Sequence, residues 1–131
     1  MTEDPDQQIR ALQKKARQAL SDAELLLENG SVEAAINRGS YAAFGAARAA
    51  LLTEGENPKT HSGVIRRFGC HFVRTGRVSD DVGDILTTAQ SMRGRADYEA
   101  TTDLSQEDAA NLVGEARRFI GIVDEKILSG P

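Results

Sequence analysis

The sequence of 131 residues has very little of several features that define large classes of protein. Its single cysteine, Cys70, excludes an intramolecular disulfide and supplies too few thiols for a structural zinc site. Tryptophan is absent and aromatic residues make up 5% of the chain, which argues against a sandwich or barrel built on aromatic strands. No apolar run approaches the ~18 residues that a membrane-spanning helix needs, so no membrane contact is expected.

Basic residues are also outnumbered. Sixteen Lys and Arg against 20 Asp and Glu give a net charge of −4, which excludes a uniformly basic nucleic-acid coat. Residues 1–8 are acidic and polar, unlike a secretory signal, and a hydrophobic content of 40% excludes wholesale disorder. We therefore expect one soluble domain over residues 1–131, with its core at about 6–128, in the reducing environment of the cytoplasm.

The abundant residues are helix formers, with alanine alone occurring 18 times. Apolar residues recur three or four positions apart, which predicts helices at about 6–28, 32–52, 60–74, 79–96 and 105–127. Ser31, Ser79 and Ser105 are the expected N-terminal caps. Because short loops favour antiparallel neighbours, the predicted fold is all-α, an up-and-down antiparallel bundle of four to five helices.

The predicted helix 32–52 is apolar on most sides, which is typical of a buried helix. It nevertheless carries a polar stripe, with spacings of 4, 3 and 4 that place the residues on one face. Two interpretations stay open, a buried polar network that fixes helix packing or a dimer, and the floor of a binding site. The stripe consists of Asn37, Tyr41, Phe44 and Arg48, with Arg38 beside it.

Residues 57–79 form a basic region with five Lys and Arg, two histidines and no acid. The region is either a set of solvated helix faces that attract acidic neighbours, or a face that binds phosphate or acidic groups. Lys59 and His61 lie where the third helix begins, so its free N–H groups and Lys59 would form an anion site. His61 would serve there as a general base near neutral pH, or alternatively has a capping or surface role.

Other chemical motifs are weak or absent. Arg93 and Asp97 have the spacing of an i,i+4 ion pair, whereas Arg66 and His71 point to different faces of their helix. The sequence has no phosphate-binding glycine loop, paired metal ligands, nucleophile elbow or dinucleotide fingerprint. We therefore expect neither a metal nor an organic cofactor, and the residues alone indicate a helical bundle with a basic face.

One string carries a family resemblance. Residues 35–44, AINRGSYAAF, resemble the N-R-x-Y-Y-A-x-F helix of HEPN domains (higher eukaryotes and prokaryotes nucleotide-binding), within a small prokaryotic branch. The resemblance continues in order and spacing through RAALL (48–52), KTHSGV (59–64), residues 68–73, TG (75–76) and RGRADY (93–98). It covers residues 10–127.

The resemblance implies a helical bundle that forms a homodimer and belongs to a toxin–antitoxin or defence system, often with a nucleotidyltransferase partner. Many HEPN domains are metal-independent ribonucleases with an arginine followed four to six residues later by a histidine, and the two motifs of the dimer form one cleft. Here the literal match is Arg66 to His71, in the third helix. Arg93 is followed instead by Asp97 and Tyr98, and Ser40 stands where a second tyrosine is common.

Three hypotheses follow. In the first, the chain is a dimeric module that binds a nucleotide or RNA, with Arg38, Lys59 and Arg93 on phosphate and Asn37 and Asp97 orienting them. In the second, it is an endoribonuclease toxin that uses a base and a cation at the phosphate. In the third, it only binds a partner protein, and Tyr98 would be modified by a nucleotidyltransferase. The first site comprises Asn37, Arg38, Tyr41, Lys59, His61, Arg93 and Asp97; the second uses His61 with Arg38 or Arg93, or the rival pair Arg66 and His71.

Overall fold

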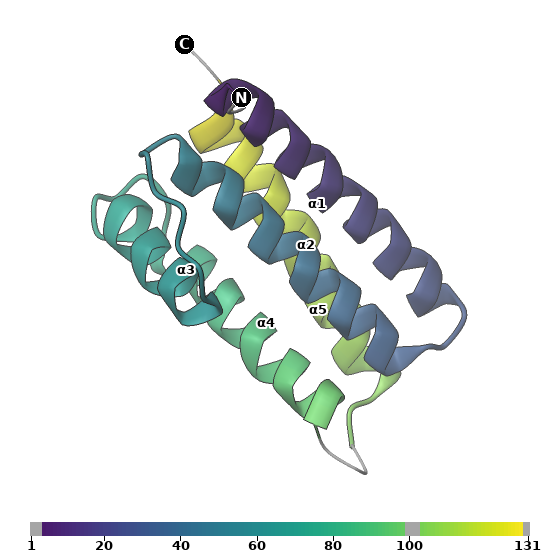
Figure 1. The fold of residues 1–131 in the computed structure, drawn as a ribbon. Coiled ribbons are helices and arrows are strands. Elements are labelled where there is room, and N and C mark those ends of the chain that lie inside the picture. The colour runs from purple at the N-terminus through teal and green to yellow at the C-terminus, as the bar shows by residue number, and fades with distance from the viewer. Residues whose placement is uncertain (1–3, 99–102, 130–131) are drawn as a thin grey trace.

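Five helices build the fold in the computed structural model, which describes residues 4–98 and 103–129 (Figure 1). They are α1 (Pro5–Glu28), α2 (Val32–Leu52), α3 (His61–Phe68), α4 (Asp80–Tyr98) and α5 (Gln106–Val123). A π-helical turn extends α3 over Gly69–Val73 and another extends α5 over Asp124–Leu128. The described residues contain no strand, so the all-α prediction is confirmed.

The caps agree with the sequence at the start of α5 but not at the start of α2. Ser105 and Asp108 form a reciprocal capping box at α5. Ser31 occupies the N-cap position of α2 as predicted, but the predicted cap by its side chain is absent, because it makes no capping hydrogen bond. Its backbone, at φ −85° and ψ 81°, departs from the extended conformation of most caps, and the connection is closed by backbone bonds instead, including Ser31 N–H to Leu26 O at 2.9 Å.

Helix α2 is the centre of the bundle, as its alanine-rich sequence predicts. It packs against each of the four other helices, and 13 of its 21 residues are buried. Small residues allow this, since a Cβ added at Gly45 would lie 3.3 Å from the Ala16 Cβ on α1. On another side of α2, a Cβ at Gly39 would lie 3.5 Å from Val113 on α5.

The other helices are distributed unevenly around α2. Helices α1 and α5 contact each other and α2, while α3 and α4 pack together across α2 from α1 (Figure 1). Phe68 on α3 connects the core to α5, with its ring 5.2 Å from Phe119 between centroids. None of the helices, as far as they are described, is long and apolar enough to cross a membrane.

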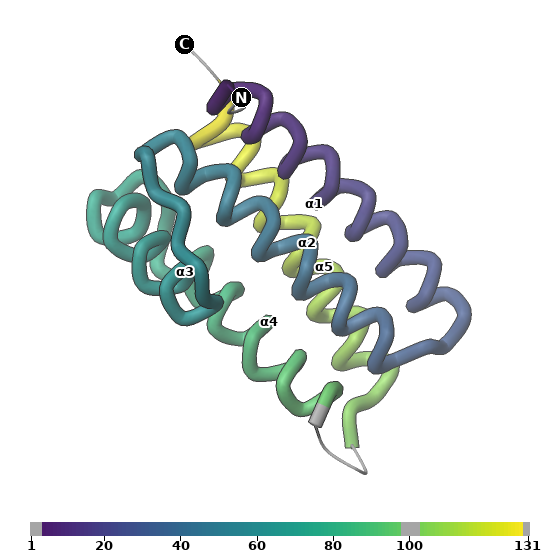
Figure 2. The backbone as a smooth tube through the Cα atoms, in the orientation of Figure 1, coloured from purple at the N-terminus to yellow at the C-terminus, as the bar shows by residue number. Residues whose placement is uncertain are grey.

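The connection between α2 and α3 determines where α3 begins. Figure 2 shows that the chain turns back after α2 and runs beside its last turns before α3 starts. Arg48 holds this path, because its Nη1 donates to the Pro58 carbonyl at 2.9 Å. Thr60 then caps α3, with its hydroxyl accepting from Gly63 N–H at 2.9 Å. As a result His61, the first residue of α3, lies against Phe44 of α2.

Candidate functional site

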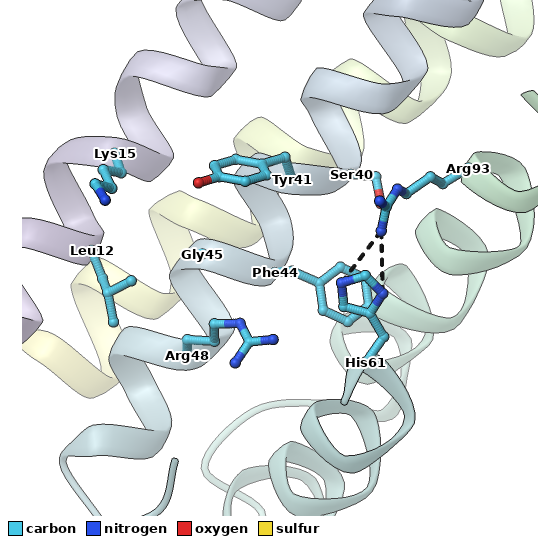
Figure 3. Close-up of a pocket in the computed structure, with 9 residues that line it drawn as sticks. All are labelled: Leu12, Lys15, Ser40, Tyr41, Phe44, Gly45, Arg48, His61 and Arg93. Atoms are coloured by element: carbon cyan, nitrogen blue, oxygen red, sulfur yellow. Dashed lines mark hydrogen bonds between the residues drawn. The ribbon is translucent and has the colours of Figure 1, made fainter. Parts of the chain in front are cut away.

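A pocket of about 210 Å³ lies on α2 between α1 and the α3–α4 pair (Figure 3). Four helices contribute to it. The side chains of Arg48, His61 and Arg93 converge near Phe44 from α2, α3 and α4. The lining residues are Leu12 and Lys15 of α1; Ser40, Tyr41, Phe44, Gly45 and Arg48 of α2; His61; and Arg93.

Arg93 also borders two further hollows. One is shared with His61, Gln90 and Asp97 on the α4 side, and the other with Asn37 and Arg38 on the α2 side. Because Arg93 is common to all three, we treat them as a single groove. The Arg93 groove is defined as Lys15, Asn37, Arg38, Tyr41, Phe44, Arg48, His61, Gln90, Arg93 and Asp97.

His61 is held in the groove by a ring contact and a guanidinium. Its ring lies 4.6 Å from that of Phe44 between centroids, tilted by 43°. The Nη1 of Arg93 lies 3.2 Å from Nδ1 and 3.3 Å from Nε2 of the same ring. Partial burial, followed by the positive charges of Arg93 and Arg48, lowers the pKa of His61 below its ordinary 6.5. A lowered pKa favours the neutral imidazole, in which one ring nitrogen accepts from Arg93 Nη1 and the other carries an N–H.

Asp97 connects Arg93 to the polar stripe of α2. Its Oδ2 lies 3.5 Å from Arg93 Nε, which is the i,i+4 ion pair that the spacing predicts. Its Oδ1 accepts from Asn37 Nδ2 at 2.7 Å. One carboxylate thus connects the Arg93 side chain of α4 to Asn37 of α2.

The polar stripe of α2 is not a buried network. Tyr41 is 50% exposed, and the guanidinium carbon of Arg38 lies 4.6 Å from its ring centroid. Arg38 also lies 3.8 Å from the Asp22 carboxylate. The buried polar residue of this part of the helix is Ser40, whose hydroxyl donates to the Ala89 carbonyl at 3.3 Å. The stripe therefore forms the floor of an open groove.

Part of the basic region at 57–79 is paired with acids that precede it. Glu56 contacts both Arg67 and His71, and its Oε2 accepts from Arg67 Nε at 2.7 Å. Glu54 lies 3.5 Å from His71 Nδ1 and 3.9 Å from Arg77. Two of the five Lys and Arg of the region, Arg67 and Arg77, thus lie against carboxylates, and the interpretation of the region as a phosphate-binding face stays a prediction. The basic region was predicted to begin at residue 57, so the prediction did not include Glu54 and Glu56, which lie just before it.

Several predicted site residues lie elsewhere. Lys59 is exposed on the α2–α3 connection and is not among the residues of the groove. Arg66 faces a separate hollow beside Cys70, and it is Arg67 whose Nη2 lies 3.2 Å from His71. Tyr98 ends α4, but its side chain lies outside what the structure describes.

Two groove residues were missed from the sequence. Lys15 lies on the exposed side of α1, where nothing in the local pattern separates it from Lys14. Gln90 precedes Arg93 by one turn of α4, and this i,i+3 spacing could have indicated it.

The charge of the pocket is opposite in sign to that of the whole chain. Lys15, Arg48 and Arg93 line it beside His61, whereas no carboxylate is among its lining residues. The chain carries −4 overall. Such a concave surface attracts anions, because its cationic side chains create a positive electrostatic potential there. Within residues 4–98 and 103–129, no group of three or more His, Cys, Asp or Glu is placed to hold a metal ion.

Comparison with known proteins identifies the family of this chain. The model of the HEPN domain matches residues 9–126. The chain is 40% identical over 121 residues to "Putative toxin MJ0605" of Methanocaldococcus jannaschii, covering 92% of this chain and 89% of that protein. It is 32% identical over 119 residues to the UPF0332 protein of Thermotoga maritima, covering 91% and 90% of the two chains.

A solved structure has the same fold at lower identity. The crystal structure of TT1696 from Thermus thermophilus superposes with a TM-score of 0.75 at 19% identity, covering 90% of this chain and 97% of that one. The two proteins thus share the helical bundle although few of their residues are identical. With the match to the family model over residues 9–126, these findings show that the chain belongs to the HEPN domain family.

Proposed function

We propose that this chain is a dimeric, toxin-like HEPN module whose Arg93 groove binds the phosphate groups of RNA or of a nucleotide. The observation that carries the proposal is the charge of the groove: the 210 Å³ pocket is lined by three cationic side chains, one histidine and no carboxylate, and the wider groove adds Arg38 and a single carboxylate, Asp97, on a protein of net charge −4. Cations on a concave surface are the general means of holding phosphate. The printed name of the M. jannaschii relative, which contains the word toxin, is consistent with a toxin-like role.

The groove also offers a surface for a base. Tyr41 is half exposed beside Arg38 and Arg93, and an exposed aromatic ring next to cations is a stacking platform for single-stranded nucleic acid. Arg93 lies at the meeting point of the three hollows. A phosphate at Arg93 would therefore leave its neighbouring base within reach of Tyr41.

Dimerisation and a partner protein are further parts of the proposal. A homodimer would place two such grooves in one particle, and a nucleotidyltransferase would be the partner in a toxin–antitoxin pair. Sedimentation of the purified chain measures the first, and co-purification with the product of a neighbouring gene measures the second. A monomer at micromolar concentration would contradict the dimer without affecting the phosphate site.

RNA binding tests the phosphate site. We expect Arg93→Gln to weaken binding of a short single-stranded RNA by about tenfold, since a contact to phosphate is a charge-assisted hydrogen bond of ~1.5–3 kcal/mol. Arg10→Gln, an exposed residue of α1 outside the groove, is the matched control. Equal binding by both variants would refute the site, provided that circular dichroism shows both to be folded.

A second candidate function is metal-independent RNA cleavage, and one geometric observation favours it. The ring nitrogens of His61 lie within 3.3 Å of the Arg93 guanidinium, and burial together with the charges of Arg93 and Arg48 lowers the pKa of the imidazole, which favours the neutral base. Once Arg93 turns from the imidazole to the phosphate, the freed ring nitrogen of His61 would take the proton of a ribose 2′-hydroxyl while the oxygen attacks the adjacent phosphorus. The bond from phosphorus to the 5′-oxygen breaks, this oxygen takes a proton from solvent water, and Arg93 stabilises the crowded phosphate.

Cleavage in the presence of EDTA, with a 2′,3′-cyclic phosphate product, tests this second function. His61→Gln should abolish it. His71→Gln should retain it, because His71 is engaged with Glu54 and Glu56 away from the groove. Loss of cleavage in His71→Gln alone would instead favour the rival pair of Arg66 and His71.

A further inference from the structure

Lys15 differs from the other cations of the Arg93 groove because it has no partner within the described part of the chain. It is exposed on α1 and lines the pocket, yet it forms no hydrogen bond or ion pair with any residue that the structure describes. Its ammonium group is therefore available to an anion in the pocket. The other three cations each lie near an oxygen atom of the protein: Arg38 3.8 Å from Asp22, Arg48 2.9 Å from Pro58 and Arg93 3.5 Å from Asp97.

Lys15 and Arg93 enter the pocket from opposite sides of α2. Lys15 belongs to α1, whereas α4, which carries Arg93, packs with α3 on the other side of α2. Figure 3 shows the ring of Tyr41 between the two cations, with its phenolic oxygen directed toward Lys15. The pocket therefore has a cation at each end and an aromatic ring in its middle.

This order of groups matches that of one part of a nucleic acid. Tyr41 is 50% exposed, so its ring can stack on a base. Leu12 and Phe44 add apolar surface to the same pocket. A nucleoside with one phosphate on its 5′ side and another on its 3′ side carries an anion at each end and a base between them. A nucleotide with phosphate on one side only would leave one of the two cations without an anion.

We propose that the Arg93 groove holds a nucleoside flanked by two phosphate groups, one at Arg93 and the other at Lys15. The inference rests on the proposed function, because it takes the first phosphate to lie at Arg93, and it adds a second phosphate subsite on α1. A lysine ammonium is a compact charge with three donors, which suits a phosphate at an exposed position. Two ligands contain this unit, a free nucleoside 3′,5′-bisphosphate and an internal nucleotide of a single strand.

The experiment uses calorimetry to compare adenosine 3′,5′-bisphosphate with adenosine 5′-diphosphate, an isomer that carries both phosphates on one side of the sugar. We expect wild type to bind the bisphosphate about tenfold more tightly, because only this isomer places a phosphate at each cation. Lys15→Gln should remove the preference. Lys14→Gln is the matched control, since Lys14 is also exposed on α1 but lies outside the groove, and it should retain the preference. The Tm of each variant shows that it is folded.

A deoxyadenosine trinucleotide, which lacks the 2′-hydroxyl that cleavage requires, separates the two sources of the ligand. If Lys15→Gln weakens its binding by about tenfold, the groove holds an internal nucleotide of a strand. If Lys15→Gln weakens only the bisphosphate, the ligand is a free nucleotide.

Two results would overturn the inference and leave the phosphate site at Arg93 intact. In one, Lys15→Gln behaves like Lys14→Gln toward all three ligands. In the other, Lys15→Gln weakens the diphosphate as much as the bisphosphate, which would mean that Lys15 attracts any anion. Wild type that binds none of the three ligands, or Arg93→Gln that binds them as wild type does, would overturn the proposed function together with the inference.

Discussion

Arg93 of α4 and His61 of α3 are in direct contact, with Nη1 of the arginine 3.2 Å from Nδ1 of the imidazole. The two residues are 32 positions apart in the sequence, and the contact exists because the α2–α3 connection returns along α2. Arg48 holds that connection through the Pro58 carbonyl. A cation thus lies beside a histidine whose pKa is lowered by burial and then by that cation, in a pocket without a lining carboxylate.

The pKa of His61 predicts a pH dependence of stability. In the unfolded chain the histidine takes up a proton near its ordinary pKa of 6.5, whereas in the folded protein it does so at lower pH. As pH falls below 6.5, the unfolded state therefore binds more protons and the free energy of unfolding decreases. We expect His61→Gln to lose this part of the decrease, measured by urea denaturation between about pH 7.5 and 5. Parallel curves for wild type and His61→Gln would contradict a depressed pKa.

Glu56 predicts a different pH response. Hydrogen bonds from Arg67 and then from His71 lower its pKa below the ordinary 4.5. Its contribution to stability is present above pH 4.5 and is lost as pH falls through the folded pKa. Glu56→Gln should therefore lower the Tm at pH 7 and make less difference at acid pH. Glu107→Gln, an exposed carboxylate in the first turn of α5, is a control for the general effect of removing one negative charge.

The close approach of α1 and α2 predicts a steric effect. Ala16 is buried against Gly45, where a Cβ would lie at 3.3 Å. Ala16→Leu should destabilise the protein by ~1–3 kcal/mol, because the added atoms force two tightly packed helices apart. Ala11→Leu adds the same atoms at an exposed position of α1 and should change stability by less than ~0.5 kcal/mol. Equal denaturation midpoints for the two variants would contradict the packing described.

Asp97 predicts an effect on affinity. The change Asp97→Asn removes the negative charge nearest to Arg93 and keeps an oxygen that can accept from Asn37. We expect tighter binding of single-stranded RNA and a steeper dependence of log affinity on log salt, because one more positive charge is available to phosphate. Weaker binding by Asp97→Asn, at unchanged Tm, would mean that the charge of Asp97 is needed to orient Arg93.

The fold could be predicted because the local signals for helix starts and ends agree with the apolar pattern that packs the helices together. The bounds of α2 follow from its apolar run between Ser31 and Thr53, and the capping box at Ser105 follows from the local sequence. The failed cap at Ser31 has a different cause. There the turn after α1, with Gly30 at φ 76°, fixes a Ser31 backbone conformation that local sequence does not report.

The candidate site was predictable only in part. Tyr41, Phe44 and Arg48 share a face of one helix, so their spacing was informative. The pairing of Glu54 and Glu56 with His71 depends on how the α2–α3 connection folds back, and spacing along a single helix contains no information on that. The place of Lys15 depends on the packing of α1 against α2, which distinguishes it from Lys14 only in three dimensions.

The most direct test of the central claim is an NMR titration of the ¹⁵N-labelled protein with short single-stranded RNA, which locates binding without any substitution. If the Arg93 groove holds phosphate, the largest amide shifts will fall at residues 41–48, 61–63 and 90–94, and added salt will reverse them. Shifts confined to the face of Arg66 and Arg74, or no shifts at all at millimolar RNA, would contradict the account.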